Sequence, residues 1–273
     1  MDIHNWILSN YAYFFIYLHQ MENVIIIMAG GLGKRMNSDL PKVLHKINNK
    51  PMLVHVIEQA IVLKPCKIFI VVGKYKIIIE ETIQQYINMD KVNIQFILQP
   101  EPLGTGHAIQ CCRDELLKMP DKNILILSGD VPLLKSDTIN NMFSGFNHVK
   151  IVTTIMENPY GYGRIIETSG EHKKEYREVF EKIVEEKDAS EEEKRVNKVN
   201  CGIYIIRSNL LCKYLPLLEN NNKQKEYYLT DIIELIKRGE NVSIDLYTIP
   251  QHRQYEIIGV NTIEQLYELE RML

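Results

Sequence analysis

The sequence predicts an α/β fold in which a mixed, mostly parallel sheet carries helices on both faces. Short apolar runs, typical of buried strands, alternate with segments whose apolar residues recur at helical spacing. Several of these runs end at glycine or proline, where buried strands enter loops. Strands that alternate with helices form parallel sheets, because each helix returns the chain across one face of the sheet.

The first half of the chain shows this alternation most clearly. The apolar residues of Pro51–Leu63 share one stripe, and proline stands at its start, as expected for an amphipathic helix. The expected strands are Val24–Met28, Lys67–Val72, Ile94–Leu98 and Asn123–Leu127, and the expected helices are Pro51–Leu63, Ile77–Ile87 and His107–Met119.

The pattern changes after about residue 150. The densely charged segment Glu171–Glu193 is interpreted as a solvated helix or a hairpin insertion. No repeat or low-complexity linker interrupts the chain, so we expect one domain over residues 23–273. The expected strands are Lys150–Met156, Gly163–Glu167, Asn200–Arg207, Val242–Thr248 and Ile257–Val260, and the helices are Tyr227–Arg238 and Thr262–Leu273.

Composition narrows the class of protein. Hydrophobic residues make up 45% and charged residues 25% of the chain, as in soluble globular proteins. A net charge of −3 gives no general attraction to nucleic acid or to anionic membranes. The five cysteines form no Cys-x-x-Cys pair, so we expect reduced thiols in the cytoplasm, without a zinc site or disulfide framework.

Residues 1–22 form an expected N-terminal extension. Its apolar run Trp6–Leu18 is short for a bilayer span, and a basic start and cleavage site for a signal peptide are both absent. We therefore expect an extra helix or a disordered extension there.

A glycine-rich loop follows the first strand. Gly30-Gly31-Leu32-Gly33 can turn tightly and present backbone N–H groups to phosphates, while Arg35 and Lys42 add cations. A Walker A loop would need Gly-Lys-Ser/Thr at its end, and a dinucleotide fingerprint would need glycine where Met36 stands. Alone, the pattern also fits a simple strand-to-helix turn.

Together with later motifs, this loop resembles the signature of sugar nucleotide pyrophosphorylases, and most of all the uridyltransferase half of bacterial bifunctional N-acetylglucosamine-1-phosphate uridyltransferase/glucosamine-1-phosphate acetyltransferases. The resemblance runs from about Val24 to the C-terminus. Its motifs are Ala29–Met36 with Pro41–His45, Gln99 with Leu103–Ala108, Gly129–Leu133, Asn158–Pro159 with Gly161–Ile165, Ile183–Glu185 with Lys187–Ala189, Glu226–Tyr228 with Thr230–Ile233, and Gly259–Asn261.

The resemblance implies a Rossmann-like nucleotidyltransferase fold, with residues 23–150 binding the nucleotide, 151–261 the sugar, and 262–273 as a closing helix. It implies Arg35 and Lys42 as catalytic residues and Asp130 and Asn261 as ligands of Mg²⁺. The implied nucleotide-binding residues are Met28, Ala29, Gly30, Gly31, Gln99, Gly104, Thr105, Ser128 and Gly129, and the implied sugar-binding residues are Gly163, Glu185, Asn200, Tyr228 and Thr230.

Simpler structural roles exist for several of these residues. Position alone suggests an Asx turn at Asp130 and a helix N-cap at Asn261 or Thr230. His107 is expected to open a helix under the nucleotide loop rather than to act as a base. Asp130 does follow a strand, at the sheet edge where open α/β folds place ligands, and Mg²⁺ accepts one or two protein oxygens.

The implied reaction converts UTP and N-acetylglucosamine 1-phosphate into UDP-N-acetylglucosamine and pyrophosphate. The alternatives are another sugar 1-phosphate or nucleotide, or a non-catalytic nucleotide-sugar sensor or scaffold. Since the chain ends at Leu273, neither acetyltransferase activity nor a trimer built by a β-helix is expected, and the oligomeric state stays open. Three residues depart from the family pattern: Leu32 replaces a frequently basic residue, Ser128 a tyrosine and Cys201 a threonine, and there is extra length between Ile166 and Ile183.

Overall fold

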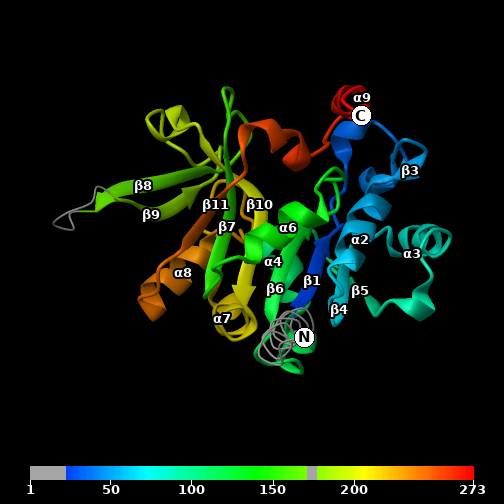
Figure 1. Ribbon diagram of the computed structural model, residues 1–273, viewed down its shortest axis with the longest axis horizontal. Coiled ribbons are helices and arrows are strands. Elements are labelled where there is room, and N and C mark those ends of the chain that lie inside the picture. Colours follow the sequence, from blue (N-terminus) through cyan, green and yellow to red (C-terminus); the bar gives the residue numbers. More distant parts are fainter. Residues whose placement is uncertain (1–22, 171–176) are drawn as a thin grey trace, which may run out of the picture.

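The computed structural model describes residues 23–170 and 177–273, and its centre is a twisted sheet (Figure 1). The expected extension at residues 1–22 lies outside these residues. The main strands run in the spatial order β11-β7-β10-β6-β1-β4-β5. Their bounds are β1 Asn23–Met28, β4 Lys67–Val72, β5 Ile94–Leu98, β6 Asn123–Ser128, β7 Val149–Ile155, β10 Lys198–Arg207 and β11 Asp245–Thr248.

The pairing confirms a mixed, mostly parallel sheet. β6, β1, β4 and β5 are parallel to one another, and β11 is parallel to β7. β10 runs antiparallel to both of its neighbours in this order, β6 and β7. The carboxyl ends of β1, β4 and β6 therefore meet at one edge, which is where open sheets of this kind bind ligands.

Helices cover both faces of the sheet. Along β1, Ile25 and Ile27 pack on one face and Val24 and Ile26 on the other, and all four are fully buried. This two-sided burial explains why the strands are continuous apolar runs. The first face carries α2 (Met52–Val62), α3 (Lys76–Gln84) and α6 (Ser136–Phe143); the second carries α4 (Thr105–Gln110), α5 (Arg113–Leu117), α7 (Ser208–Tyr214) and α8 (Asp231–Glu240).

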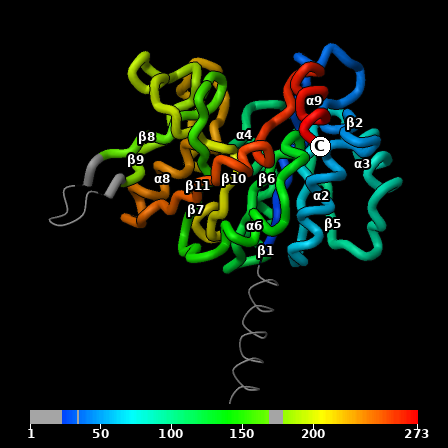
Figure 2. The backbone as a smooth tube through the Cα atoms, turned by 45° about the horizontal axis from the view of Figure 1, so that its top comes forward, coloured from blue at the N-terminus to red at the C-terminus, as the bar shows by residue number. Residues whose placement is uncertain are grey.

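The C-terminal helix α9 (Ile263–Glu270) lies beside the small hairpin of β2 (Lys46–Ile47) and β3 (Lys50–Pro51), as both views show (Figure 2). A separate apolar cluster joins them, and the backbone N–H of Asn48 donates to Glu270 at 3.0 Å. The closing helix predicted at Thr262–Leu273 is therefore present, with Thr262 as its N-cap.

Two predicted helices differ in extent. The expected helix His107–Met119 is two helices, α4 and α5, because the backbone tightens at Cys112, whose N–H donates to Ile109 three residues back at 3.0 Å. The helix expected from Tyr227 begins only at Asp231. The Tyr227 N–H instead donates to the Leu103 carbonyl at 2.8 Å, and its carbonyl accepts from the N–H of Gly106 in the first turn of α4 at 2.7 Å, so this residue stays outside the helix.

The strand predicted at Ile257–Val260 is wrong. Residues Gln251–Ile257 form a 3₁₀ helix, and Val260 makes one sheet-like bond, from its N–H to the Asp130 carbonyl at 2.9 Å. Val260 is apolar because it is buried against α9, not because it pairs in the sheet. Helices α6 and α7 were not predicted, since both are short and carry several polar residues.

The charged insertion contributes a strand, which favours the hairpin interpretation over the helix. β8 (Arg164–Gly170) and β9 (Arg177–Val184) pair antiparallel and project from the body of the sheet (Figure 1). A 3₁₀ turn at Glu193–Arg195 follows before β10. Within the described part of the chain, no helix combines the length and the apolar content that a membrane crossing requires.

Candidate functional site

The glycine-rich loop leaves its backbone donors free. Ala29 still belongs to the sheet, since its N–H donates to Val71 at 2.7 Å. The N–H groups of the next four residues, 30–33, have no acceptor among the described residues. Gly33 has a positive φ of 61°, and a Cβ there would lie 2.8 Å from the Lys42 Cβ. The loop thus packs closely against the Lys42 segment and has backbone N–H groups without a partner among the described residues. Such N–H groups are what a bound phosphate needs as donors.

A polar cluster stands at the carboxyl end of β6. The Lys42 ammonium contacts Asp130 Oδ2 and lies 3.0 Å from Asn261 Oδ1, which also accepts from the Arg35 guanidinium at 3.0 Å. Four residues predicted separately, as two cations and two metal ligands, are therefore brought together. The Lys42 and Asp130 side chains are largely buried, which strengthens the interaction between their charges.

This cluster fits a divalent cation. Oxygens of Asp130 and Asn261 converge on a single positive centre, the Lys42 ammonium, so both can reach one ion. Among residues 23–170 and 177–273, no group of three or more His, Cys, Asp or Glu side chains could hold a metal by itself. A carboxylate and an amide oxygen, completed by phosphates and water, match what Mg²⁺ prefers.

The simpler roles for the two metal-ligand candidates are not the ones observed. The α9 cap is Thr262, whose side chain accepts from the N–H of Gln265, so Asn261 is free to face Lys42. The Asp130 carboxylate accepts from the Ser128 hydroxyl at 2.7 Å and from Lys42. Ser128 stands where the family pattern has a tyrosine, and its hydroxyl orients the Asp130 carboxylate.

The predicted uridine-binding residues are connected through Gln99, which lies against Gly30 and bonds Gly104. Gln99 is buried, donates to the Gly104 carbonyl at 3.1 Å, and places its amide oxygen so close that a Cβ on Gly30 would lie 2.8 Å from it. Gly104 has a φ of 111°, and a Cβ there would meet the Tyr227 carbonyl at 2.5 Å. The Thr105 hydroxyl accepts from the N–H of Leu229 at 3.0 Å.

Two further predictions concern this region. His107 lies in α4 beneath the loop, and its Nδ1 lies 2.9 Å from the Glu101 carbonyl, as a structural residue would. The N–H of Gly129 donates to the Met28 carbonyl at 2.9 Å, which joins the ends of β1 and β6. Every predicted nucleotide-binding residue thus lies at the carboxyl edge of the parallel strands, in the loop before α4, or, for Thr105, at the first position of α4.

Comparison with known proteins accords with this arrangement. The family model described as nucleotidyl transferase matches residues 24–248. The chain belongs to the nucleotidyl transferase family. A probable UDP-N-acetylglucosamine pyrophosphorylase of Acanthamoeba polyphaga mimivirus is 43% identical over 252 residues, which cover 90% of this chain and 94% of that protein.

A second sequence relative and a solved structure are also similar to this nucleotidyl transferase. The bifunctional protein GlmU of Clostridium botulinum (strain 657 / Type Ba4) is 41% identical over 256 residues; the match covers 92% of the chain but 52% of GlmU, so the chain spans about half its length. A crystal structure of UDP-glucose pyrophosphorylase complexed with UDP-glucose superposes with a TM-score of 0.70 at 19% identity, covering 92% of this chain and 98% of that one, which confirms the predicted fold.

The second half of this nucleotidyl transferase holds the predicted sugar residues around Glu185. Thr230 stands at the N-cap position of α8, but its hydroxyl donates to Glu185 Oε1 at 3.1 Å and makes no capping hydrogen bond to the helix. A Cβ on Gly163 would lie 3.4 Å from Glu185 Oε2, so the glycine keeps space beside the carboxylate. Burial raises the pKa of the Glu185 carboxyl.

Tyr228 and Asn200 are held by their own neighbours. The Tyr228 hydroxyl lies between Gln224 at 2.7 Å and Asp188 at 3.2 Å, and burial raises its pKa to about 12. The Asn200 amide donates to the Tyr204 hydroxyl at 2.6 Å and accepts from Gly202 at 3.1 Å. These bonds fix both side chains before any ligand binds.

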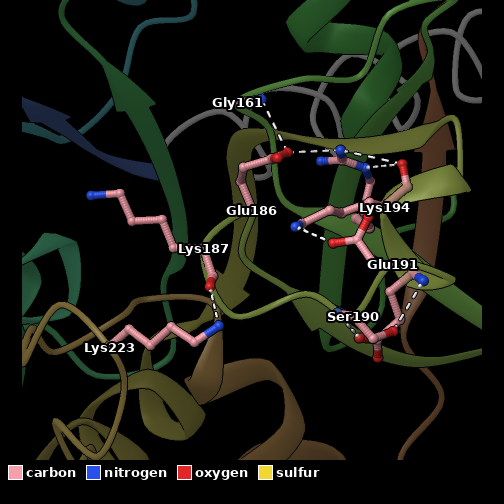
Figure 3. A network of polar contacts seen from close by, with 9 residues as sticks. Gly161, Glu186, Lys187, Ser190, Glu191, Lys194 and Lys223 are labelled. Carbon is pink, nitrogen blue, oxygen red and sulfur yellow. Dashed lines mark hydrogen bonds and ion pairs between the residues drawn. The ribbon is translucent and has the colours of Figure 1, made fainter.

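A polar network that the sequence did not reveal supports the sugar residues (Figure 3). Arg164 is only 2% exposed, donates to Glu186 at 2.7 Å and also bonds the Tyr162 carbonyl. Since Arg164 follows Gly163 and Glu186 follows Glu185, this ion pair holds together the two segments that carry these predicted sugar-binding residues. In the sequence, Arg164 is noticeable only as a member of the motif Gly161–Ile165.

Proposed function

We propose that this nucleotidyl transferase joins UTP to N-acetylglucosamine 1-phosphate, forming UDP-N-acetylglucosamine and pyrophosphate. The observation that carries the proposal is the convergence of Lys42, Asp130 and Asn261 beside a loop of free N–H groups. The names of the mimivirus relative and of GlmU support the choice of sugar.

The reaction is an in-line displacement at the α-phosphorus. A phosphate oxygen of the sugar 1-phosphate forms the new O–P bond, the bond to the β-phosphate oxygen breaks, and pyrophosphate leaves. That oxygen is already ionised at neutral pH, so no protein base is needed. Positioning and charge neutralisation carry such transfers.

Each residue of the cluster has a role in this scheme. Asp130 and Asn261 would hold Mg²⁺, which neutralises phosphate charge and aligns the reacting oxygens. Lys42 stabilises charge at the α-phosphate, and Arg35 with the loop amides holds the departing pyrophosphate. Gln99 offers both a donor and an acceptor to the uracil edge.

The residues grouped around Glu185 support an N-acetylated substrate. Glu185 accepts from sugar hydroxyls, Asn200 bonds the N-acetyl group and Gly163 leaves room for it. Residues 23–150 would then serve as the nucleotide-binding half and residues 151–261 as the sugar-binding half. Free cysteines throughout the described chain support a cytoplasmic enzyme.

The test is pyrophosphate release from UTP and N-acetylglucosamine 1-phosphate, with and without Mg²⁺. Release that needs the metal and that falls when glucose 1-phosphate replaces the N-acetylated sugar is expected. Equal turnover of glucose 1-phosphate would shift the assignment to another sugar. UTP and UDP-N-acetylglucosamine binding without any metal-dependent turnover would indicate a sensor instead.

A further inference from the structure

A hollow beside the glycine-rich loop has no role in the scheme above. Its volume is about 400 Å³, and it is lined by Leu32 and Gly33 of the loop, by the segment Asn37–Asp39, and by Lys74 and Tyr75. Lys74 follows β4, the strand adjacent to β1 in the sheet (Figure 1). The hollow is thus built where the carboxyl ends of two neighbouring parallel strands meet.

Close backbone packing fixes Lys74 at this place. The N–H of Ala29 donates to the Val71 carbonyl at 2.7 Å, so the β1 loop leaves the sheet against β4. A Cβ on Gly73 would lie 2.9 Å from the Gly30 carbonyl oxygen, so only glycine permits this approach. The residue after Gly73 is therefore held alongside the loop whose N–H groups are free.

The charge of Lys74 is available for a ligand. Its ammonium lies 4.6 Å from the centre of the Tyr75 ring, and in the described part of the chain it makes no ion pair with a carboxylate. Arg35 and Lys42, by contrast, already contact Asn261 and Asp130 in the polar cluster at the end of β6. Among the described residues that line the hollow, Lys74 is the cation.

We infer that Lys74 and this hollow bind the outer phosphates of UTP, and hence the pyrophosphate that leaves. The inference rests on the proposed function, in which UTP is the nucleotide. Lys74 would supply a positive charge beside the backbone N–H groups of the glycine-rich loop. An ammonium over an aromatic ring beside free N–H groups suits a polyphosphate, which carries several negative charges. Asp39, also in the lining, opposes that charge and limits how tightly the product is held.

Calorimetric titration of the whole protein with UMP, UTP and pyrophosphate, with Mg²⁺ present, tests this inference. Lys74→Ala is expected to weaken UTP and pyrophosphate binding roughly tenfold, the usual scale for one charge-assisted contact, and to leave UMP unchanged. Lys74→Arg should restore most of the loss, and Asp39→Asn should tighten pyrophosphate binding.

Lys76→Ala is the matched control, because Lys76 lies two residues on and pairs with Glu80 at 3.6 Å outside the hollow. If Lys74→Ala changes UTP and pyrophosphate no more than Lys76→Ala does, or weakens UMP equally, the inference is overturned. No step of this test uses sugar phosphate. An absence of turnover with N-acetylglucosamine 1-phosphate would therefore count against the proposed function alone.

Discussion

The ammonium nitrogen of Lys42 lies 3.0 Å from the amide oxygen of Asn261, although 219 positions separate the two residues. An apolar cluster brings their segments together: Met36 and Ile47 flank Lys42 in the sequence, and both pack with Val260, the residue before Asn261. Asn261, from the C-terminal part of the chain, thus joins the polar cluster that contains Lys42 and Asp130.

Lys42→Met removes the charge at this centre and keeps much of the apolar stem. We expect kcat to fall by ~10²–10³, the usual loss when one charge-stabilising group is removed. Steady-state rates of pyrophosphate release would measure it. Lys46→Met, an exposed lysine on β2, serves as the control and should keep full activity. A fully active Lys42→Met variant would remove Lys42 from the mechanism.

Ser128→Ala removes the hydroxyl that lies 2.7 Å from Asp130 Oδ1. Losing a partner that orients a metal ligand typically costs 10–100-fold in metal affinity. We therefore expect Mn²⁺ binding in the presence of nucleotide, followed by electron paramagnetic resonance, to weaken on about that scale. Ser128→Thr keeps the hydroxyl and should bind metal normally. Unchanged Mn²⁺ affinity in the alanine variant would show that Asp130 needs no such support.

Thr230→Val deletes the donor to Glu185 and keeps the shape of the side chain. Burial already raises the pKa of Glu185, and this hydrogen bond opposes that effect, so the variant should raise the pKa further. As the pH is lowered, Glu185 of the variant should become protonated at a higher pH than in the wild type. The KM for sugar phosphate should therefore rise at that higher pH, while the KM for UTP stays constant. Thr230→Ser should keep the wild-type pH profile, and an identical profile for Thr230→Val would contradict the assignment.

Glu186→Gln leaves the buried Arg164 guanidinium without its carboxylate, which is itself 20% exposed. Breaking such a pair costs about 3 kcal/mol of the free energy of unfolding, because one charge stays buried and unpaired. Urea unfolding would show the loss. Glu191→Gln, in the exposed Lys194–Glu191 pair of the same network (Figure 3), should change stability by less than about 1 kcal/mol. Equal effects of the two changes would place the Arg164 pair among ordinary surface contacts.

Asp231→Asn tests a pH dependence of stability. Burial, with a further contribution from Glu185, raises the pKa of Asp231 to about 6. The folded protein therefore holds this proton more tightly than the unfolded chain, so the contribution of Asp231 to stability declines between about pH 4 and 6. The asparagine variant should gain stability relative to the wild type over that window and keep the gain above it. The free energies of unfolding of both proteins, measured at several pH values, test this. If the difference between them did not change with pH, Asp231 would be freely solvated in the folded protein.

Local pattern was enough for the main strands of the large sheet and for most helices, because burial on both faces leaves uninterrupted apolar runs such as those of β1 and β4. It failed where a backbone contact from elsewhere overrides local preference. Tyr227 stays outside α8 because its N–H bonds Leu103 and its carbonyl bonds Gly106 at the start of α4. Residues 257–260 form no strand, since the sheet-like contact of this segment is the single bond from the Val260 N–H to Asp130.

By itself, the sequence determined the α/β class and, through ordered motifs, the family, and it predicted the glycine-rich phosphate loop and the residues of the candidate site. Tertiary structure alone decided which of them meet. It placed Lys42 between Asp130 and Asn261, directed the Thr230 hydroxyl to Glu185, and set Lys74 beside the loop. The physical reason is that these contacts join residues far apart in the chain, and only packing of the sheet and its helices sets those distances.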